Sequence, residues 1–399
     1  MMKKVCSIFI FLSFFILSGC WDQYELEERA NILGLAIDLV EQEDIKEENE
    51  VTHPEGEFPN EKRHTFYKIT AQIAVPGKIK LGPEGGSEGS DKTSWVIQTT
   101  GHTLKDAMAN LQQQLAERLY LGHLQIVIIS DEIAERGIED VNDYLGRNPE
   151  VRRTAWMVVN KKDASKVIQA APPLETVPSL YLSDTLDNAV KFGKLPREYL
   201  GRFWIDLSDK GIDGILPAVK VVDNDRIMVD GFALFRGEKM VDRTTPIEIG
   251  VLMNLTESNA GGYSTPVEVQ DGIYFIESQE RTNNIDVTLK DGEPTANISV
   301  KIDAILDEQI NTDSLNDEVI NEIEKEANKK MEKLSQKLVA SLQDTGSDAL
   351  GIGARIRAKH GGYWDKEIQS DERWIDVFQE MDISITYHYR IRRAGIRSQ

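Results

Sequence analysis

The chain has 399 residues, of which 40% are hydrophobic and 28% charged, as in globular domains rather than disordered segments. Its formal net charge of −21 argues against nucleic acid as a partner, because phosphate binding requires a basic surface. The length is sufficient for two or three domains.

The N-terminal end has the parts of a bacterial lipoprotein signal. Lys3 and Lys4 form a charged start, and the apolar run over 5–17 is too short for a comfortable membrane span, which needs about 20 residues. The run ends in a lipobox, Leu17-Ser18-Gly19-Cys20. We therefore predict that residues 1–19 are a signal peptide, that Leu17, Ser18 and Gly19 are recognised by the signal peptidase, and that Cys20 receives the S-diacylglycerol and N-acyl groups. The alternative is a plain secretory signal followed by a chance cysteine.

Cleavage before Cys20 would remove Cys6, and acylation would use the other of the 2 cysteines. No thiol would then remain for a disulfide, a nucleophile or a metal site. Lys3 and Lys4 would also be lost, so the formal net charge of −21 becomes two units more negative, −23. Anionic lipid repels such a chain on average, and the acyl chains therefore have to supply the anchoring.

The pattern after the signal predicts three domains of mixed α/β and α+β class. In the first, residues 20–200, strands are expected over 31–40, 66–75, 95–100, 124–129 and 154–159. Thr103 can cap a helix whose apolar stripe continues to Leu115 and Leu119, and further helices are expected over 131–136, 138–145, 164–170, 179–192 and 197–207. The alternation of helices with strands favours an α/β arrangement.

A small middle α+β domain is predicted over 201–275, with a meander of strands at 215–222, 228–235 and 239–242 and a helix that opens at Pro246. The segment 258–265 is rich in Gly and Ser and is interpreted as a loop or boundary. The last domain, 276–399, is predicted to be an antiparallel-type sheet packed by a long helix. Its strands are expected over 285–289, 295–306 and 382–392, and its helix over 314–343, where apolar residues recur every three or four positions.

Few residues suggest chemistry. The chain has 6 histidines, none paired at metal-ligand spacing, and each is interpreted as solvated or hydrogen-bonded: His53, His64, His102, His123, His360 and His388. Gly351 and Gly353 supply two of the three glycines of a dinucleotide loop, but Ile356 takes the third position, so a tight turn is favoured. No catalytic, cofactor-binding or metal-ligating residue is predicted. Abundant carboxylates leave an acid pair possible by inventory, without singling one out.

Several separated segments together resemble the Ger(x)C family of spore germination lipoproteins. They are Gly19-Cys20-Trp21-Asp22 with Glu25, Leu26, Arg29 and Ala30; Gly231-Phe232-Ala233-Leu234-Phe235 with Lys239-Met240-Val241; Asp348-Ala349-Leu350-Gly351-Ile352-Gly353 with Trp364 and Trp374; and the end Ile391-Arg392-Arg393-Ala394-Gly395. Departures are the acidic insertion over 41–59 and the glycine-rich acidic loop after Pro76.

The resemblance implies the C subunit of a GerA-type nutrient germinant receptor, which is not an enzyme and needs no cofactor. It implies a lipid-anchored body on the outer face of the spore inner membrane, with integral membrane A- and B-type subunits as partners. Binding of a small molecule by this subunit is left open. The alternatives are a solute-binding lipoprotein of a membrane uptake system, for which two similar lobes would be expected, and an exported hydrolase, against which the poor inventory of catalytic motifs counts.

Overall fold

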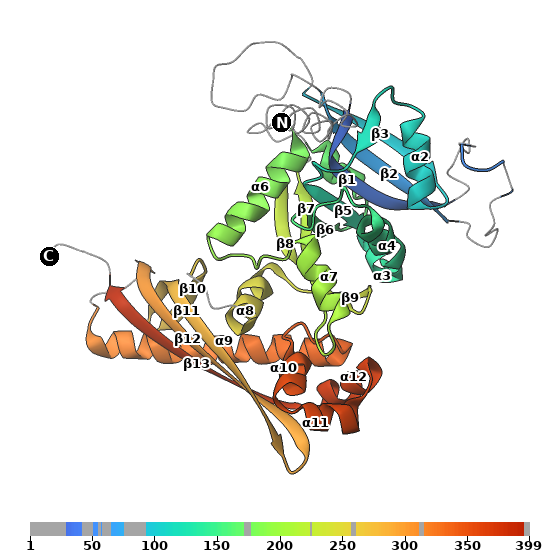
Figure 1. Ribbon diagram of the computed structural model, residues 1–399. Helices are drawn as coiled ribbons and strands as arrows, with labels where there is room; N and C mark the ends of the chain where they lie inside the picture. Colours follow the sequence, from blue (N-terminus) through green and yellow to red (C-terminus); the bar gives the residue numbers. More distant parts are fainter. Residues whose placement is uncertain are drawn as a thin grey trace, which may run out of the picture.

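The computed structural model describes residues 29–41, 51–54, 57, 65–75, 93–170, 177–223, 226–256, 261–310 and 315–394. Two sheets and the helices around them make up this part of the chain (Figure 1). The mixed α/β class predicted from the sequence is confirmed.

The first sheet has a parallel centre and antiparallel flanks, in the order β3-β2-β1-β5-β6-β7-β8-β9, with the short β4 also paired to β1. Strands β1, β5, β6 and β7 run parallel to one another. The pairings β1–β2, β2–β3, β7–β8 and β8–β9 are antiparallel. The strands are β1 (Arg29–Glu41), β2 (Thr65–Ala74), β3 (Ser94–Gly101), β4 (Arg118–Tyr120), β5 (Ile126–Ser130), β6 (Trp156–Asn160), β7 (Ile215–Val222), β8 (Arg226–Arg236) and β9 (Lys239–Arg243).

Helices cover both faces of this sheet, which explains why its central strands are almost wholly apolar. One face packs on α2 (Leu104–Gln112), α3 (Asp131–Arg136), α4 (Glu139–Arg147) and α7 (Leu200–Ser208). The other packs on α5 (Ser165–Gln169), α6 (Pro178–Lys191) and α8 (Pro246–Thr256), and its core continues into the second sheet. The two sheets are thus joined through buried apolar side chains.

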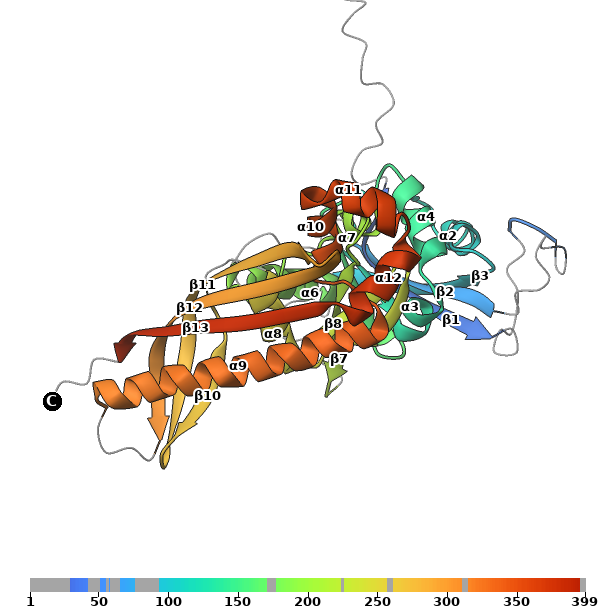
Figure 2. The ribbon, with the colours of Figure 1, turned by 90° about the horizontal axis from the view of Figure 1, so that it is seen from below.

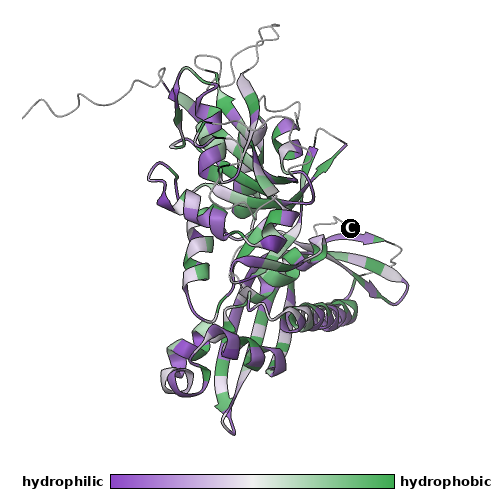
Figure 3. Ribbon diagram, turned by 90° about the vertical axis from the view of Figure 1, so that its right-hand side faces the viewer, coloured by the Kyte–Doolittle hydropathy of each residue, from purple (hydrophilic) through white to green (hydrophobic). Residues whose placement is uncertain are grey.

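The second sheet has the order β10-β11-β12-β13 and is covered on one face by the long α9 (Asp317–Thr345), as Figure 2 shows. Its strands are β10 (Ser264–Val269), β11 (Gly272–Lys290), β12 (Glu293–Ile310) and β13 (Asp382–Ala394). Between α9 and β13 lie α10 (Ile352–Lys359), α11 (Gly361–Tyr363), the π-helical turn η3 (Trp364–Ile368) and α12 (Asp371–Glu380). Seen almost end-on in Figure 3, α9 exposes a largely hydrophilic surface, whereas its stripe of apolar residues is buried.

Several sequence predictions differ from the structure. The helix that Thr103 caps ends at Gln112, before Leu115 and Leu119, because the Gln112 side chain binds the Glu117 carbonyl and the Leu119 N–H and turns the chain into β4. The antiparallel pairing holds for β10 to β12, but β13 is parallel to β12. Strands β7–β9 were assigned to a separate middle unit over 201–275, but β7 hydrogen-bonds to β6, and β8 and β9 continue the first sheet beyond it.

The free edge of β13 is closed by side chains of α9. The backbone N–H groups of Tyr387, Tyr389 and Ile391 donate to the side chains of Glu332, Asn328 and Glu324, at 3.1, 2.8 and 2.7 Å. These acceptors are four residues apart on the helix and the donors are two apart on the strand, so the two periods match over this length. An edge strand with unpaired N–H groups is a template for unwanted pairing, and this ladder removes it.

Replacing the three acceptors together by alanine should therefore leave three edge N–H groups without their partners. We expect a loss of about 1–3 kcal/mol in the free energy of unfolding, measured in urea, and concentration-dependent self-association on gel filtration. Glu324→Gln with Glu332→Gln is the matched control, because each amide oxygen still accepts a hydrogen bond. Equal destabilisation and association in both variants would show that charge rather than edge closure matters.

Candidate functional site

The predicted anchor, Cys20 with Leu17, Ser18 and Gly19, lies outside the described residues. The first described residue is Arg29, nine positions after Cys20, and it begins β1 in the middle of the first sheet. The surroundings of Arg29 are thus the part of the described body nearest to the anchor along the chain. Among the described residues, no helix is both long and apolar enough to cross a membrane.

A cationic and aromatic cluster surrounds this first residue. In the parallel β1–β4 ladder Arg29 stands opposite Arg118, and its guanidinium lies 4.5 Å from the centre of the Tyr120 ring. The His123 ring meets Tyr120 edge-on at 5.8 Å. Burial lowers the pKa of His123, and the positive charges of Arg152 and Arg29 lower it further. We call Arg29, Arg118, Tyr120, His123 and Arg152 the root cluster.

One carboxylate is built into the root cluster. Glu150 forms an ion pair with Arg118 at 3.8 Å and accepts a hydrogen bond from the Leu121 N–H at 3.0 Å. The second contact ties Glu150 to the backbone just after β4. Glu150 therefore positions this strand as well as offsetting part of the arginine charge.

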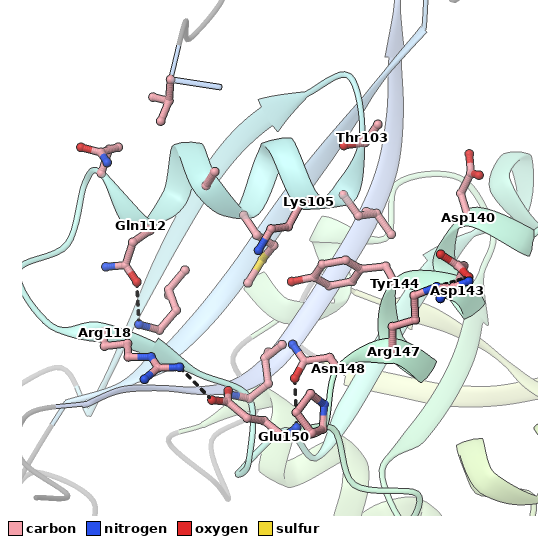
Figure 4. A pocket seen from close by; sticks show the side chains of 18 residues that line it. Thr103, Lys105, Gln112, Arg118, Asp140, Asp143, Tyr144, Arg147, Asn148 and Glu150 are labelled. Atoms are coloured by element: carbon pink, nitrogen blue, oxygen red, sulfur yellow. Dashed lines mark hydrogen bonds and ion pairs between the residues drawn. The ribbon is translucent and has the colours of Figure 1, made fainter. Parts of the chain in front are cut away.

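A groove of about 880 Å³ opens beside the root cluster and shares Arg118 and Glu150 with it (Figure 4). Helices α2 and α4 line it, and the side chains of Lys105 and Tyr144 project into the space between them (Figure 4). Asp143 and Arg147 form an exposed ion pair at 2.7 Å on α4. Burial raises the pKa of Tyr144 to about 12. The described lining presents charges of both signs, so it can contact polar groups.

Two histidines far apart in the sequence lie close together on the same unit. The rings of His53 and His102 are 5.0 Å apart, and His102 packs on Phe66 at 4.2 Å. Asp106, the cap-box residue of α2, lies 3.9 Å from the His53 Nδ1 and accepts the His102 N–H at 2.9 Å. The sequence did not indicate this proximity, because His53 follows an acidic run interpreted as loop.

The other histidines are scattered. His360 Nε2 lies 3.4 Å from the Val287 carbonyl, His388 is exposed on β13, and His64 is outside the described residues. Within the described ranges, no three His, Cys, Asp or Glu side chains are placed to hold a metal ion.

The segment 348–353 connects the two sheets. The fully buried Asp348 accepts the N–H groups of Ile352 and Gly353 at the start of α10, at 3.0 and 2.8 Å, and the indole N–H of Trp374 at 3.1 Å. Its own backbone exchanges two hydrogen bonds with Asp213, which precedes β7. Asp348 thus caps a helix of the C-terminal part while fixing it to the first sheet.

Glycine is required at positions 351 and 353 for two different reasons. Gly351 has φ +65°, a left-handed conformation that favours glycine, as the predicted tight turn requires. Gly353 packs so closely that an added Cβ would lie 2.5 Å from the Trp374 ring and 2.7 Å from the Gly211 Cα. Glycine is therefore required at position 353 by close packing against the Gly211 backbone and the Trp374 ring, and not by phosphate binding as in a dinucleotide loop.

A second junction uses a buried cation. Arg281 on β11 is 1% exposed and donates to the carbonyl of Gly193, at the end of α6, over 3.1 Å. The hydroxyl of Tyr263 donates to the next carbonyl, that of Lys194. The second sheet is thus attached to the first unit at two places, through the segment 348–353 and through the end of α6.

The comparisons with known proteins agree with this arrangement. The family model for the spore germination protein N-terminal domain matches residues 22–221, and the model described as spore germination B3/GerAC like, C-terminal, matches 230–395. The chain therefore belongs to the Ger(x)C family of spore germination proteins.

Individual relatives are distant but cover the whole length. Spore germination protein KC of Bacillus subtilis (strain 168) is 24% identical, over 99% of this chain and 97% of its own. Spore germination protein B3 of the same organism is 24% identical, over 98% and 99%. The crystal structure of the GerBC protein matches with a TM-score of 0.54 and 19% identity, over 81% of this chain and 93% of that one, which shows a shared fold.

The junction at Asp348 predicts a dependence of stability on pH. The pKa of Asp348 is raised to about 7. Burial is the main cause, the N–H donors of Gly353 and Ile352 lower the pKa, and the negative charge of Asp213 raises it. Because the folded state then binds a proton that the unfolded chain has released, the free energy of unfolding should fall as pH rises from about 4 to about 7. The contribution of Asp348 is on the order of a few kcal/mol.

Urea unfolding at several pH values tests this. Asp348→Asn should lower stability, because its amide N–H₂ meets N–H donors, and should flatten the pH dependence between about 5 and 7. Asp344→Asn, an exposed substitution on α9, is the control and should leave the slope unchanged. An unchanged slope in Asp348→Asn would contradict the assignment.

Proposed function

We propose that this chain is the lipid-anchored C subunit of a nutrient germinant receptor, required for spores to begin germination in response to nutrients. The observation that carries the proposal is the match of both Ger(x)C domain models, in order and over nearly all of the chain that follows the predicted signal. The lipobox at Cys20 adds the expected means of attachment. Relatives named spore germination protein B3 and A3 support a role in the same process.

In this proposal the body lies on the outer face of the spore inner membrane, next to integral membrane A- and B-type subunits. The lipid keeps it at high effective concentration near these partners, so that modest contacts suffice for assembly. The charged groove between α2 and α4 offers polar contacts on the membrane-proximal unit, and no step of catalysis is required of it.

A solute-binding lipoprotein would share the anchor. Such proteins are expected to have two similar α/β lobes with a cleft between them. In the part of the chain that the structure describes, a sheet of nine strands is followed by a four-stranded sheet of different topology, which favours the receptor role over the transporter role.

Deletion of the gene in the spore-forming host should abolish or strongly slow nutrient-triggered germination, measured as loss of optical density of a spore suspension. Germination by nutrient-independent agents should remain normal, because these bypass the receptor. Other germinant receptors should be removed first, since redundancy hides the effect. A normal nutrient response in that background, with lost uptake of a defined solute, would favour the transporter role instead.

Cys20→Ala should abolish incorporation of labelled fatty acid and move the protein from the membrane to the soluble fraction of broken spores. The reason is that stable anchoring needs the acyl chains. The spores are broken in high salt, which screens contacts between the charged body and lipid headgroups. Cys6→Ala is the matched control and should keep both label and location, because Cys6 lies in the predicted signal. Retained labelling in Cys20→Ala would contradict the lipobox assignment.

A further inference from the structure

The root cluster is a concentration of positive charge on a strongly acidic chain. Arg29 and His123 contact the Tyr120 ring, Arg118 stands opposite Arg29 in the β1–β4 ladder, and the charge of Arg152 acts on His123, whereas the whole chain has a formal net charge of −21. Arg118 and Arg152 are exposed at the surface, and Arg29 is half-buried. Glu150, which pairs with Arg118, is the carboxylate that the described structure places among them.

The position of the root cluster, close to Cys20 along the chain, would hold it near the membrane surface. Arg29 lies nine positions after Cys20, and an extended chain spans at most about 3.3–3.6 Å per residue, which gives a reach of roughly 30 Å. If Cys20 is acylated, as the proposed function requires, Arg29 cannot move farther than this from the headgroups of the membrane. The inference therefore rests on the anchoring in that proposal.

We propose that the root cluster binds the phosphates of anionic lipid headgroups and so fixes the orientation of the anchored body. The planar guanidinium matches phosphate geometry with two donors, and an amphipathic ring such as Tyr120 suits the headgroup level. Stacking of Arg29 on Tyr120 at 4.5 Å pre-orders one of these donors.

The acidic character of the chain does not prevent this contact. Charges in solution are screened over about 10 Å at moderate ionic strength, so carboxylates farther away act weakly on a phosphate held by the cluster. The closest competitors in the sequence are the four acidic residues between Cys20 and Arg29, namely Asp22, Glu25, Glu27 and Glu28. These could pair with the arginines in place of lipid, and the experiment has to separate the two occupants.

The test uses the chain from residue 20 with Cys20→Ser, since every described element begins at or after Arg29 and none is lost with the signal. Binding is measured by co-sedimentation with vesicles of phosphatidylglycerol and phosphatidylcholine, and with vesicles of phosphatidylcholine alone. We expect binding to the first kind only, weakened by salt. Arg29→Glu with Arg152→Glu should reduce it by roughly thirtyfold or more, since each arginine near an anionic surface contributes about a fivefold effect.

The matched control is Lys366→Glu with Arg373→Glu, the same change of charge on exposed residues of η3 and α12, and α12 lies in the lower part of Figure 1, away from β1. It should bind like the parent. Circular dichroism of each variant separates lost binding from lost folding.

Equal binding to both vesicle types, or an equal loss in the control pair, would overturn the proposal. So would a parent chain that binds only after Asp22, Glu25, Glu27 and Glu28 are neutralised, because the cluster would then serve the chain's own carboxylates. Germination of the deletion strain is independent of this measurement, so failure here leaves the receptor role standing, and failure there leaves the lipid contact standing.

Discussion

The buried carboxylate of Asp348 is the contact on which the relation between the two sheets depends. It is placed where α9 has ended and α10 begins, and it holds the first N–H groups of α10 while its backbone is paired with Asp213 beside β7. A charge taken out of water is costly unless several donors surround it, and here three N–H groups do so. The geometry that satisfies this one side chain fixes the start of α10, the indole of Trp374 and the approach of Gly353 to Gly211 together.

This constraint has a consequence at a distance. With the Arg281–Gly193 contact at the other junction, the long α9 and the second sheet cannot turn freely against the first sheet. A body held at two junctions transmits an orientation imposed at one end to the other. In an anchored protein the orientation would be imposed at the N-terminal end, where β1 starts, and the second sheet would then take a defined place relative to the membrane.

The sequence predicts a helix or strand correctly where one hydrophobic pattern continues over the whole element. The stripe of α9 and the apolar runs of β5 and β6 were recognised because burial of one helix face, or of both strand faces, leaves a regular pattern. The first half of β11 is missed because the bulge at Ser278/Glu280 interrupts its alternation and the next buried position is the cation of Arg281. The parallel pairing of β13 was missed because a single strand carries no sign of its partner's direction.

The candidate site likewise has a part that a local motif indicates and a part that only the fold brings together. The assignment of Cys20 rests on a local lipobox and stays a prediction. The root cluster joins residues from β1, from β4 and from the segments that follow β4 and precede β6, so no spacing in the sequence reveals it. Composition was misleading here for a physical reason: net charge describes the far field of the molecule, whereas a headgroup in contact responds to the few charges within about a Debye length. A chain can therefore be acidic enough to avoid the membrane at random and still present one basic face to it, provided that a tether selects that face.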